Sequence, residues 1–488
     1  MNKRTLPIFV LLLMISAIWI VFDQHGKINN DGVLYLRQAN LFTNGNFEAA
    51  KSLFSWPFFA FFIAKTHVLS GLSLLYSAQL INILLFTTAS YFFLKTLNIL
   101  SKDSLVLLFG FLTLITSIPI MDDYLPMLMR DNGMWAGFTA GLYFYLSWSQ
   151  NPTYINATFM QFSFLIGALF RPELLIFSIL IPLSVFWVKP NQIGRIKASL
   201  MTGSILFLSG FLLSCYLIYH FHDLDLISIY TGRLVELYER PKSIILSLFE
   251  PLPMRVVTDY YFLHRSIDEH FLALKYGFIT YIIIYKWIVT IGFLHFVTAI
   301  ICIKKRLFPT DLTGPILFAF FLSFAITAIN YPTFYALSGR YWIMNLWVVY
   351  LASSLGLLYL IRQLGELKNK YSVIGKTLLG IILISYTIVV LFDSHHKTTD
   401  MEAVDWIKVH QLDLDHTFID NPRLCFYLGR FDCESIGLEK AKKEKYTYLI
   451  FHLDRYQTYG EIKGYELVKK IPEKNNKPSF VIYKKTEF

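Results

Sequence analysis

Long apolar runs constrain this chain more than any other feature of its sequence. A helix of about 20 apolar residues spans the hydrocarbon core of a bilayer, and the sequence holds about eleven stretches of that kind. They lie near residues 6–22, 72–94, 105–120, 133–149, 155–170, 174–188, 198–219, 278–303, 314–330, 341–361 and 377–392. We therefore expect a mainly α-helical, polytopic membrane protein with about eleven transmembrane helices, all within residues 1–392.

Composition agrees with this expectation. Hydrophobic residues make up 55% of the 488 residues and charged residues only 16%, whereas soluble domains carry about 25% charged residues. The first apolar run is followed by no small-residue cleavage site, so we expect it to remain as a helix and not to be removed as a signal peptide.

Basic residues are distributed unevenly among the predicted loops. Single lysine or arginine residues occur in the segments 121–132, 171–173 and 331–340. Two or more occur in the segments 1–5, 95–104, 189–197, 304–306 and 362–376. The positive-inside rule then predicts a cytoplasmic N-terminus, and an odd number of spans puts the C-terminal end outside. The net charge of +10 comes from basic residues in short loops between apolar runs, where they set the orientation in the membrane. We therefore do not expect nucleic-acid binding.

Three segments are predicted to lie on the outer side: the loops 23–71 and 220–277, and the C-terminal residues 393–488. The last of these has charged residues throughout and short strand-like patterns, which predict a small α/β domain. Asp400 is a candidate helix cap there. Cys425 and Cys433 are a candidate disulfide if the domain is exported, and two unpaired thiols if it is not.

The segment Asn29–Phe42 follows the first apolar run and predicts an amphipathic helix on the membrane surface. Asp31 is expected at its N-cap, where it is either only a cap or a functional carboxylate. The expected water-facing side chains are Arg37, Gln38 and Asn40, and the expected lipid-facing ones are Val33, Leu34, Leu36, Leu41 and Phe42.

Several short motifs occur in an order that resembles the integral membrane glycosyltransferases of the C fold type (GT-C). These include the protein O-mannosyltransferases and the lipid A aminoarabinose transferases. The first-loop residues that carry the resemblance are Asp31, Tyr35, Gly45, Asn46, Trp56 and Pro57, followed by SGLSLLYSAQLINILL at 70–85. The later motifs are RDNGMWAGF at 130–138, RPELL at 171–175, GRYWIMNLW at 339–347 and AVDWIKVHQLDLDHTFIDNPRLCFYLGR at 403–430.

The resemblance implies an enzyme that moves a sugar from a polyprenyl-phosphate carrier, with inversion, to an acceptor at the outer face of the membrane. The acceptor would be a glycolipid, a polysaccharide or a protein, and a bacterial inner membrane is the expected location. Asp31 would be the general base. Asp131 would orient the acceptor or help to bind a divalent metal ion, and its alternative role is another helix cap.

Cationic side chains are needed to hold the departing lipid phosphate. Arg171 and Arg340 each stand alone in a predicted outer loop, where the lipid phosphate or Glu173 would supply a counter-charge; otherwise they extend to lipid headgroups. Lys286, within an apolar run, is a third candidate. The candidate substrate-binding residues are therefore Arg171, Glu173, Arg340, Tyr341, Tyr35, Trp56 and Lys286.

Two other interpretations stay open. His220, His222 and Asp223 are weak candidates for a metal site, with a solvated turn as the simpler explanation. A transporter or flippase of lipid-linked sugars would explain the apolar helices, but it explains neither the large first loop nor the C-terminal domain. The sequence has no P-loop and no dinucleotide-binding glycine pattern, so a nucleotide-sugar donor is not expected.

Overall fold

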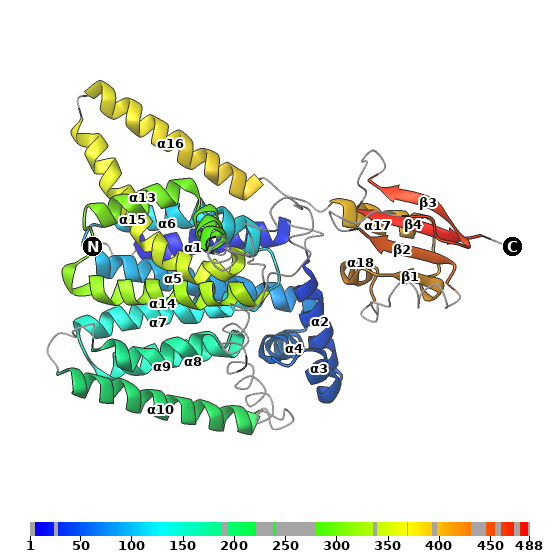
Figure 1. Ribbon diagram of the computed structural model, residues 1–488, viewed down its shortest axis with the longest axis horizontal. Coiled ribbons are helices and arrows are strands. Elements are labelled where there is room, and N and C mark those ends of the chain that lie inside the picture. Colours follow the sequence, from blue (N-terminus) through cyan, green and yellow to red (C-terminus); the bar gives the residue numbers. More distant parts are fainter. Residues whose placement is uncertain are drawn as a thin grey trace, which may run out of the picture.

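The computed structural model shows a helical bundle with a small mixed domain at one end (Figure 1). The N-terminus lies at the opposite end of the bundle. Besides the single residues Glu239 and Gly277, the structure describes residues 5–23, 28–186, 194–220, 280–334, 339–367, 369–392, 398–430, 446–453, 460–472 and 479–486.

The bundle is made of helices that run roughly along its length (Figure 1), together with two short helical turns. They are α1 (Thr5–Asp23), α5 (Leu74–Leu100), α6 (Val106–Ile115) with the π-helical turn η1 (Ile118–Tyr124), α7 (Asp131–Gln150), α8 (Tyr154–Phe170), α9 (Leu174–Ser184), α10 (Arg195–His220), α13 (Phe293–Lys304), α14 (Thr310–Phe334), the 3-10 turn η4 (Gly339–Trp342), α15 (Ile343–Glu366) and α16 (Asn369–Phe392).

Seven helical segments among the described residues are long and apolar enough to cross a membrane. An eighth is possible if the bent pair Thr280–Ile291 and Phe293–Lys304 counts as one span. The prediction of about eleven spans is therefore supported only in part. The other three stretches form α7, α8 and α9, of which α8 and α9 are short, with 17 and 11 residues.

Two of the eleven predicted spans, 278–303 and 133–149, have features that their apolar sequences did not predict. The stretch 278–303 bends by 99°, because Gly292 adopts a left-handed φ of 81° that a regular helix does not allow. Helix α7 is long enough to span, but it is rich in glycine and polar residues and is buried along most of its length. Its neighbours are protein helices, and this explains why its sequence is less apolar than that of its surroundings.

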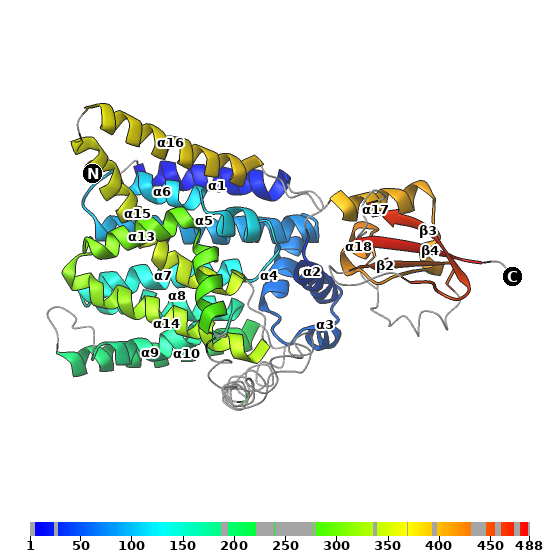
Figure 2. The same ribbon diagram turned by 45° about the horizontal axis from the view of Figure 1, so that its top comes forward.

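The segment after α1 folds into three helices at the end of the bundle that faces the C-terminal domain (Figures 1 and 2). They are α2 (Asn30–Thr43), α3 (Phe47–Leu53) and α4 (Phe58–Ser70). The predicted α2 helix is present, but its N-cap is Asn29, and Asp31 lies in the first turn. The predicted cap role of Asp31 is therefore wrong.

The packing of α2 also differs from the prediction. Val33, Leu36 and Phe42 are buried in a protein core formed with α4, so these side chains contact protein and not lipid. Gln38 was expected to face water, yet it is fully buried and donates hydrogen bonds to the carbonyl oxygens of Ala50 and Phe54, both at 2.7 Å. Backbone acceptors thus satisfy the amide N–H groups of Gln38, while its Oε1 is buried without a hydrogen-bond partner among the described residues.

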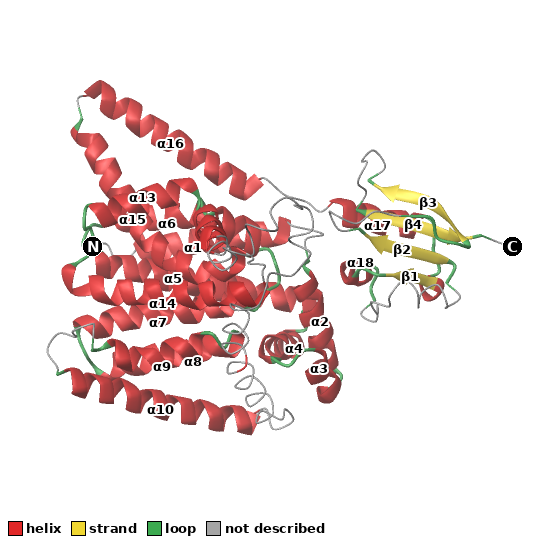
Figure 3. Ribbon diagram, viewed as in Figure 1, coloured by secondary structure: helices red, strands yellow, loops and turns green. Residues whose placement is uncertain are grey.

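The C-terminal domain contains a four-stranded sheet covered by two helices (Figure 3). The strand order is β1-β2-β4-β3, with β1 and β2 parallel and the other neighbours antiparallel. The elements are α17 (Thr398–Val409), the 3-10 turn η5 (Leu414–His416), β1 (Thr417–Ile419), α18 (Pro422–Tyr427), β2 (Tyr448–His452), β3 (Tyr465–Ile471) and β4 (Phe480–Lys485). The small α/β domain is thus present.

Details of this domain correct or extend the prediction. Asp400 lies in the first turn of α17 and is not its cap; it is buried, and its carboxylate is 3.3 Å from Nε of Arg423. Cys425 is disulfide-bonded, and its predicted partner Cys433 lies outside the described residues. The hydroxyl of Tyr427 accepts a hydrogen bond of 3.0 Å from the backbone N–H of Ile28, which fastens the domain to the start of α2.

Candidate functional site

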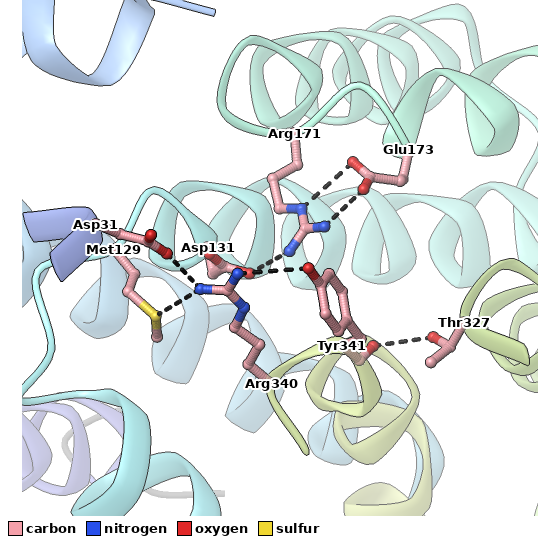
Figure 4. A network of polar contacts seen from close by, with 8 residues as sticks. All are labelled: Asp31, Met129, Asp131, Arg171, Glu173, Thr327, Arg340 and Tyr341. Carbon is pink, nitrogen blue, oxygen red and sulfur yellow. Dashed lines mark hydrogen bonds and ion pairs between the residues drawn. The ribbon is translucent and has the colours of Figure 1, made fainter. Parts of the chain in front are cut away.

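Charged side chains from four separate segments meet at the end of the bundle next to α2 (Figure 4). We call them the charged cluster. It consists of Asp31 in the first turn of α2, Asp131 in the first turn of α7, Arg171 and Glu173 in the turn between α8 and α9, and Arg340 with Tyr341 in η4. The structure thus brings together both predicted acids and both predicted arginines, which are scattered over most of the sequence.

Arg171 is the buried centre of the cluster. Its Nη1 donates to Asp131 at 2.5 Å, and its Nη2 and Nε donate to the two carboxylate oxygens of Glu173 at 2.6 and 3.3 Å. Burial alone would raise the pKa of Glu173, but the charge and hydrogen bonds of Arg171 overcome this and hold that pKa at about 2. Glu173 is therefore the counter-charge of Arg171, one of the two that the sequence allowed.

Arg340 occupies the more open side of the cluster. Its Nη1 donates to Asp31 at 2.5 Å, and the two side chains are 27% and 40% exposed. Its Nη2 lies 3.4 Å from the hydroxyl of Tyr341. Asp31 is therefore the cluster acid that a molecule from solution reaches most easily, since the side chains of Asp131 and Glu173 are 4% and 14% exposed.

The ring of Tyr341 joins the two halves of the cluster. The guanidinium carbons of Arg171 and Arg340 lie 4.9 and 5.2 Å from its centroid, within the range of a cation–π interaction. The backbone carbonyl of Tyr341 accepts a hydrogen bond from Thr327 of α14 at 2.9 Å, as Figure 4 shows. This hydrogen bond fixes the backbone of Tyr341, and the ring of Tyr341 separates the two guanidinium groups.

Close helix packing sets the positions of the acids and arginines. An added Cβ on Gly137 of α7 would lie 2.5 Å from the Cα of Gly167 in α8, so these helices touch along their backbones. The contact lies two turns or less from Asp131 and Arg171. It therefore fixes the spacing between the two elements whose ends carry that ion pair.

Two predicted substrate-binding aromatics are buried in the first loop. Trp56 is 2% exposed and its Nε1 donates to the carbonyl of Leu169 at 2.7 Å, which ties the loop to the end of α8. Tyr35 is 5% exposed and packs against Phe54 and Phe59. Burial raises the pKa of Tyr35 to about 12. Both side chains support the loop that carries Asp31.

The remaining predicted residues are not joined to the cluster. Lys286 is exposed on the helix Thr280–Ile291. Among the described residues, no ion pair links it to the charged cluster. The side chain of His220, together with His222 and Asp223, lies outside the described residues. Among the residues that the structure does describe, no group of three or more histidine, cysteine, aspartate or glutamate residues is placed to hold a metal ion.

Sequence reasoning missed Arg130, which comes directly before Asp131. Its guanidinium carbon lies 5.0 Å from the ring centroid of Phe54 in the first loop, and its charge acts on Glu173 and Tyr35. The available signal was its place as a single basic residue in a predicted outer loop, the same feature that singled out Arg171 and Arg340.

Beside Arg171, Glu173 and Tyr341 there is a small pocket with room for about one water molecule. No protein-family model matches the chain, and no curated protein matches it. The functional argument therefore depends on the chemistry of the charged cluster itself.

Proposed function

We propose that the chain is a multi-pass membrane protein whose charged cluster lies at the outer face of the membrane. The seven apolar helices support the membrane location. The orientation is supported by the arrangement of the ends: α2, the turn between α8 and α9, and the C-terminal domain lie at the end opposite the N-terminus (Figure 1). These are the segments that the positive-inside rule assigns to the outer side.

At that face the protein transfers a sugar from a polyprenyl-phosphate carrier to an acceptor hydroxyl or amine, with inversion. The observation that carries this proposal is the Asp31–Arg340 pair, a half-exposed carboxylate in contact with a cation at one end of an apolar bundle. The two reactants differ in solubility, because the donor is anchored in lipid and the acceptor group approaches from water. The pair stands where both can reach.

The residues divide the reaction between them. The acceptor oxygen or nitrogen attacks the anomeric carbon, and its proton moves to a carboxylate oxygen of Asp31. The bond between the anomeric carbon and the phosphate oxygen breaks, and the electron pair leaves with the polyprenyl phosphate. Arg340 stabilises that anion. When the phosphate binds Arg340, it also weakens the hold of Arg340 on Asp31, so the base becomes available as the donor arrives.

Asp131, Arg171 and Glu173 play a different part in this proposal. Every nitrogen of the Arg171 guanidinium already donates to a carboxylate, so Arg171 is a poorer phosphate ligand than the sequence suggests. In this proposal Arg171 contacts the ring of Tyr341. Its ion pair also holds Asp131 close to the reacting groups. Carboxylate oxygens are suitable ligands for a divalent metal ion, but no three acids or histidines among the described residues are placed to hold one.

The experiment compares cells that carry the wild-type gene, no gene, or a gene for Asp31→Asn. Mass spectrometry of envelope glycolipids, polysaccharides and glycoproteins should show one sugar mass that is lost without the gene and with Asp31→Asn. Membrane vesicles with the wild-type protein should release free polyprenyl phosphate as that sugar is transferred. A flippase would move the lipid-linked sugar without releasing the phosphate, so sugar movement without release would overturn the enzyme proposal.

A further inference from the structure

The three arginines of the site differ in how far their donors are already used. Arg171 donates from all three guanidinium nitrogens to Asp131 and Glu173. Arg340 donates to Asp31 and to Tyr341. The side chain of Arg130 forms no hydrogen bond and no ion pair with any residue that the structure describes, and its Nη1 is buried from solvent. The Nε of Arg340 is also buried without a hydrogen-bond partner among the described residues, but of the three arginines only Arg130 has its whole guanidinium group left for a ligand.

Arg130 is nevertheless part of the site. It adjoins Asp131 in the chain, and its positive charge lowers the pKa of Glu173 after the larger effect of Arg171. It also opposes the rise that burial causes in the pKa of Tyr35. Its field therefore reaches the turn between α8 and α9 as well as α2.

The position of Arg130 favours an anion as its missing partner. Its guanidinium lies over the Phe54 ring at 5.0 Å, which stabilises the cation from one face but satisfies none of its N–H groups. A buried donor without an acceptor is costly, and native structures usually supply one. Guanidinium groups bind carboxylates and phosphates through paired N–H donors, and the carboxylates of the charged cluster are bonded to the other two arginines.

We propose that Arg130 binds the phosphate of the lipid-linked donor, as a second phosphate ligand beside Arg340. This inference rests on the proposed function for the identity of the ligand as a polyprenyl phosphate ester. It places the phosphate between the first loop, which supplies Phe54, and the start of α7. The apolar chain then lies along the bundle, and the anomeric carbon lies toward Asp31 and Asp131.

The test measures binding of undecaprenyl phosphate to the full-length protein in nanodiscs made of zwitterionic lipid, with the uncharged alcohol undecaprenol and inorganic phosphate as the other two probes. The variants are Arg130→Gln, Arg130→Lys and the control Arg37→Gln, which removes one positive charge from α2 in the first loop. We expect wild type to bind undecaprenyl phosphate at least about tenfold more tightly than undecaprenol, because hydrogen bonds to charged groups are strong.

Arg130→Gln should weaken binding of undecaprenyl phosphate by about tenfold or more and leave undecaprenol binding unchanged. Arg130→Lys should fall between, because it keeps the charge but loses the paired donors, and Arg37→Gln should bind as wild type. Unchanged undecaprenol binding also shows that a variant is folded. If Arg130→Gln and wild type bind undecaprenyl phosphate equally, or if inorganic phosphate binds wild type as tightly as the lipid, the inference is wrong.

These outcomes are separable from those of the proposed function. Normal phosphate discrimination by Arg130→Gln, together with sugar transfer by wild type, would refute the role of Arg130 and leave the enzyme intact. Loss of discrimination in Arg130→Gln, together with sugar movement without release of polyprenyl phosphate, would confirm the phosphate ligand and refute the transferase.

Discussion

Arg340 donates a hydrogen bond of 2.5 Å to Asp31, although the two residues are 309 positions apart in the sequence. The pair joins the first turn of α2 to η4 and stands on the open side of the charged cluster (Figure 4). Because Arg340 neutralises the most accessible acid, an incoming anion must compete with Asp31 for this cation. Binding of an anionic donor and release of the base are therefore linked through one contact.

Asp31→Asn should lower the rate of sugar transfer by about 10² to 10⁴, because the acceptor loses its proton acceptor. Stability should hardly change, since a partly exposed ion pair contributes only about 0–1 kcal/mol. Transfer rates in membrane vesicles and melting temperatures in detergent measure the two effects. Glu48→Gln, an exposed acid on α3, is the matched control and should behave as wild type. Transfer by Asp31→Asn at a near-normal rate would exclude Asp31 as the base.

Arg171→Met should be strongly destabilising, by about 3–5 kcal/mol, because it leaves two buried carboxylates without their cation. The control is Arg362→Met. Arg362 lies near the C-terminal end of α15, far from the charged cluster at its N-terminal end, and it is 60% exposed and pairs with Asp103. That change should cost only about 0–1 kcal/mol. Denaturant unfolding in detergent gives both values. Equal losses in the two variants would contradict the buried, central role of Arg171.

Glu173 should make stability depend on acid pH. Its pKa is about 2 in the folded protein and 4.5 ordinarily, so the folded state binds fewer protons than the unfolded state between these values. The contribution is complete above about pH 4.5 and is lost as the pH falls toward 2. Melting temperatures across this range should fall for wild type and fall less for Glu173→Gln. A parallel fall in both proteins would show that other groups cause the acid sensitivity.

Gly137→Ala should separate α7 from α8, because the new Cβ would meet the backbone of Gly167 and the carbonyl oxygen of Ser163 at 2.5 and 2.7 Å. We expect a loss of about 1–3 kcal/mol, typical of overpacking, and a lower transfer rate as Asp131 and Arg171 shift. Gly203→Ala in α10 is the matched control, since its Cβ would meet nothing within 4 Å. It should keep or slightly raise the melting temperature. Unfolding and transfer assays on both variants test this.

The sequence determined the features that depend on local composition. Apolar runs indicated a helical bundle, and the uneven loop charges predicted which end of each helix faces the cytoplasm. The polar composition after residue 392 indicated a separate α/β domain. These properties can be read along the chain because hydrophobic burial and strand or helix periodicity act over neighbouring residues. The resemblance added which acids and arginines to consider, but not how they pair.

Only the tertiary structure decided the pairing and the accessibility of these groups. Gln38 was expected in water and is buried, because α3 brings the carbonyl oxygens of Ala50 and Phe54 to it. Arg171 is bonded to two acids, Arg340 to one, and Arg130 to none among the described residues. The same residue type thus has three environments. Each depends on contacts between distant segments, and local sequence does not encode which side chain meets which across a packed bundle.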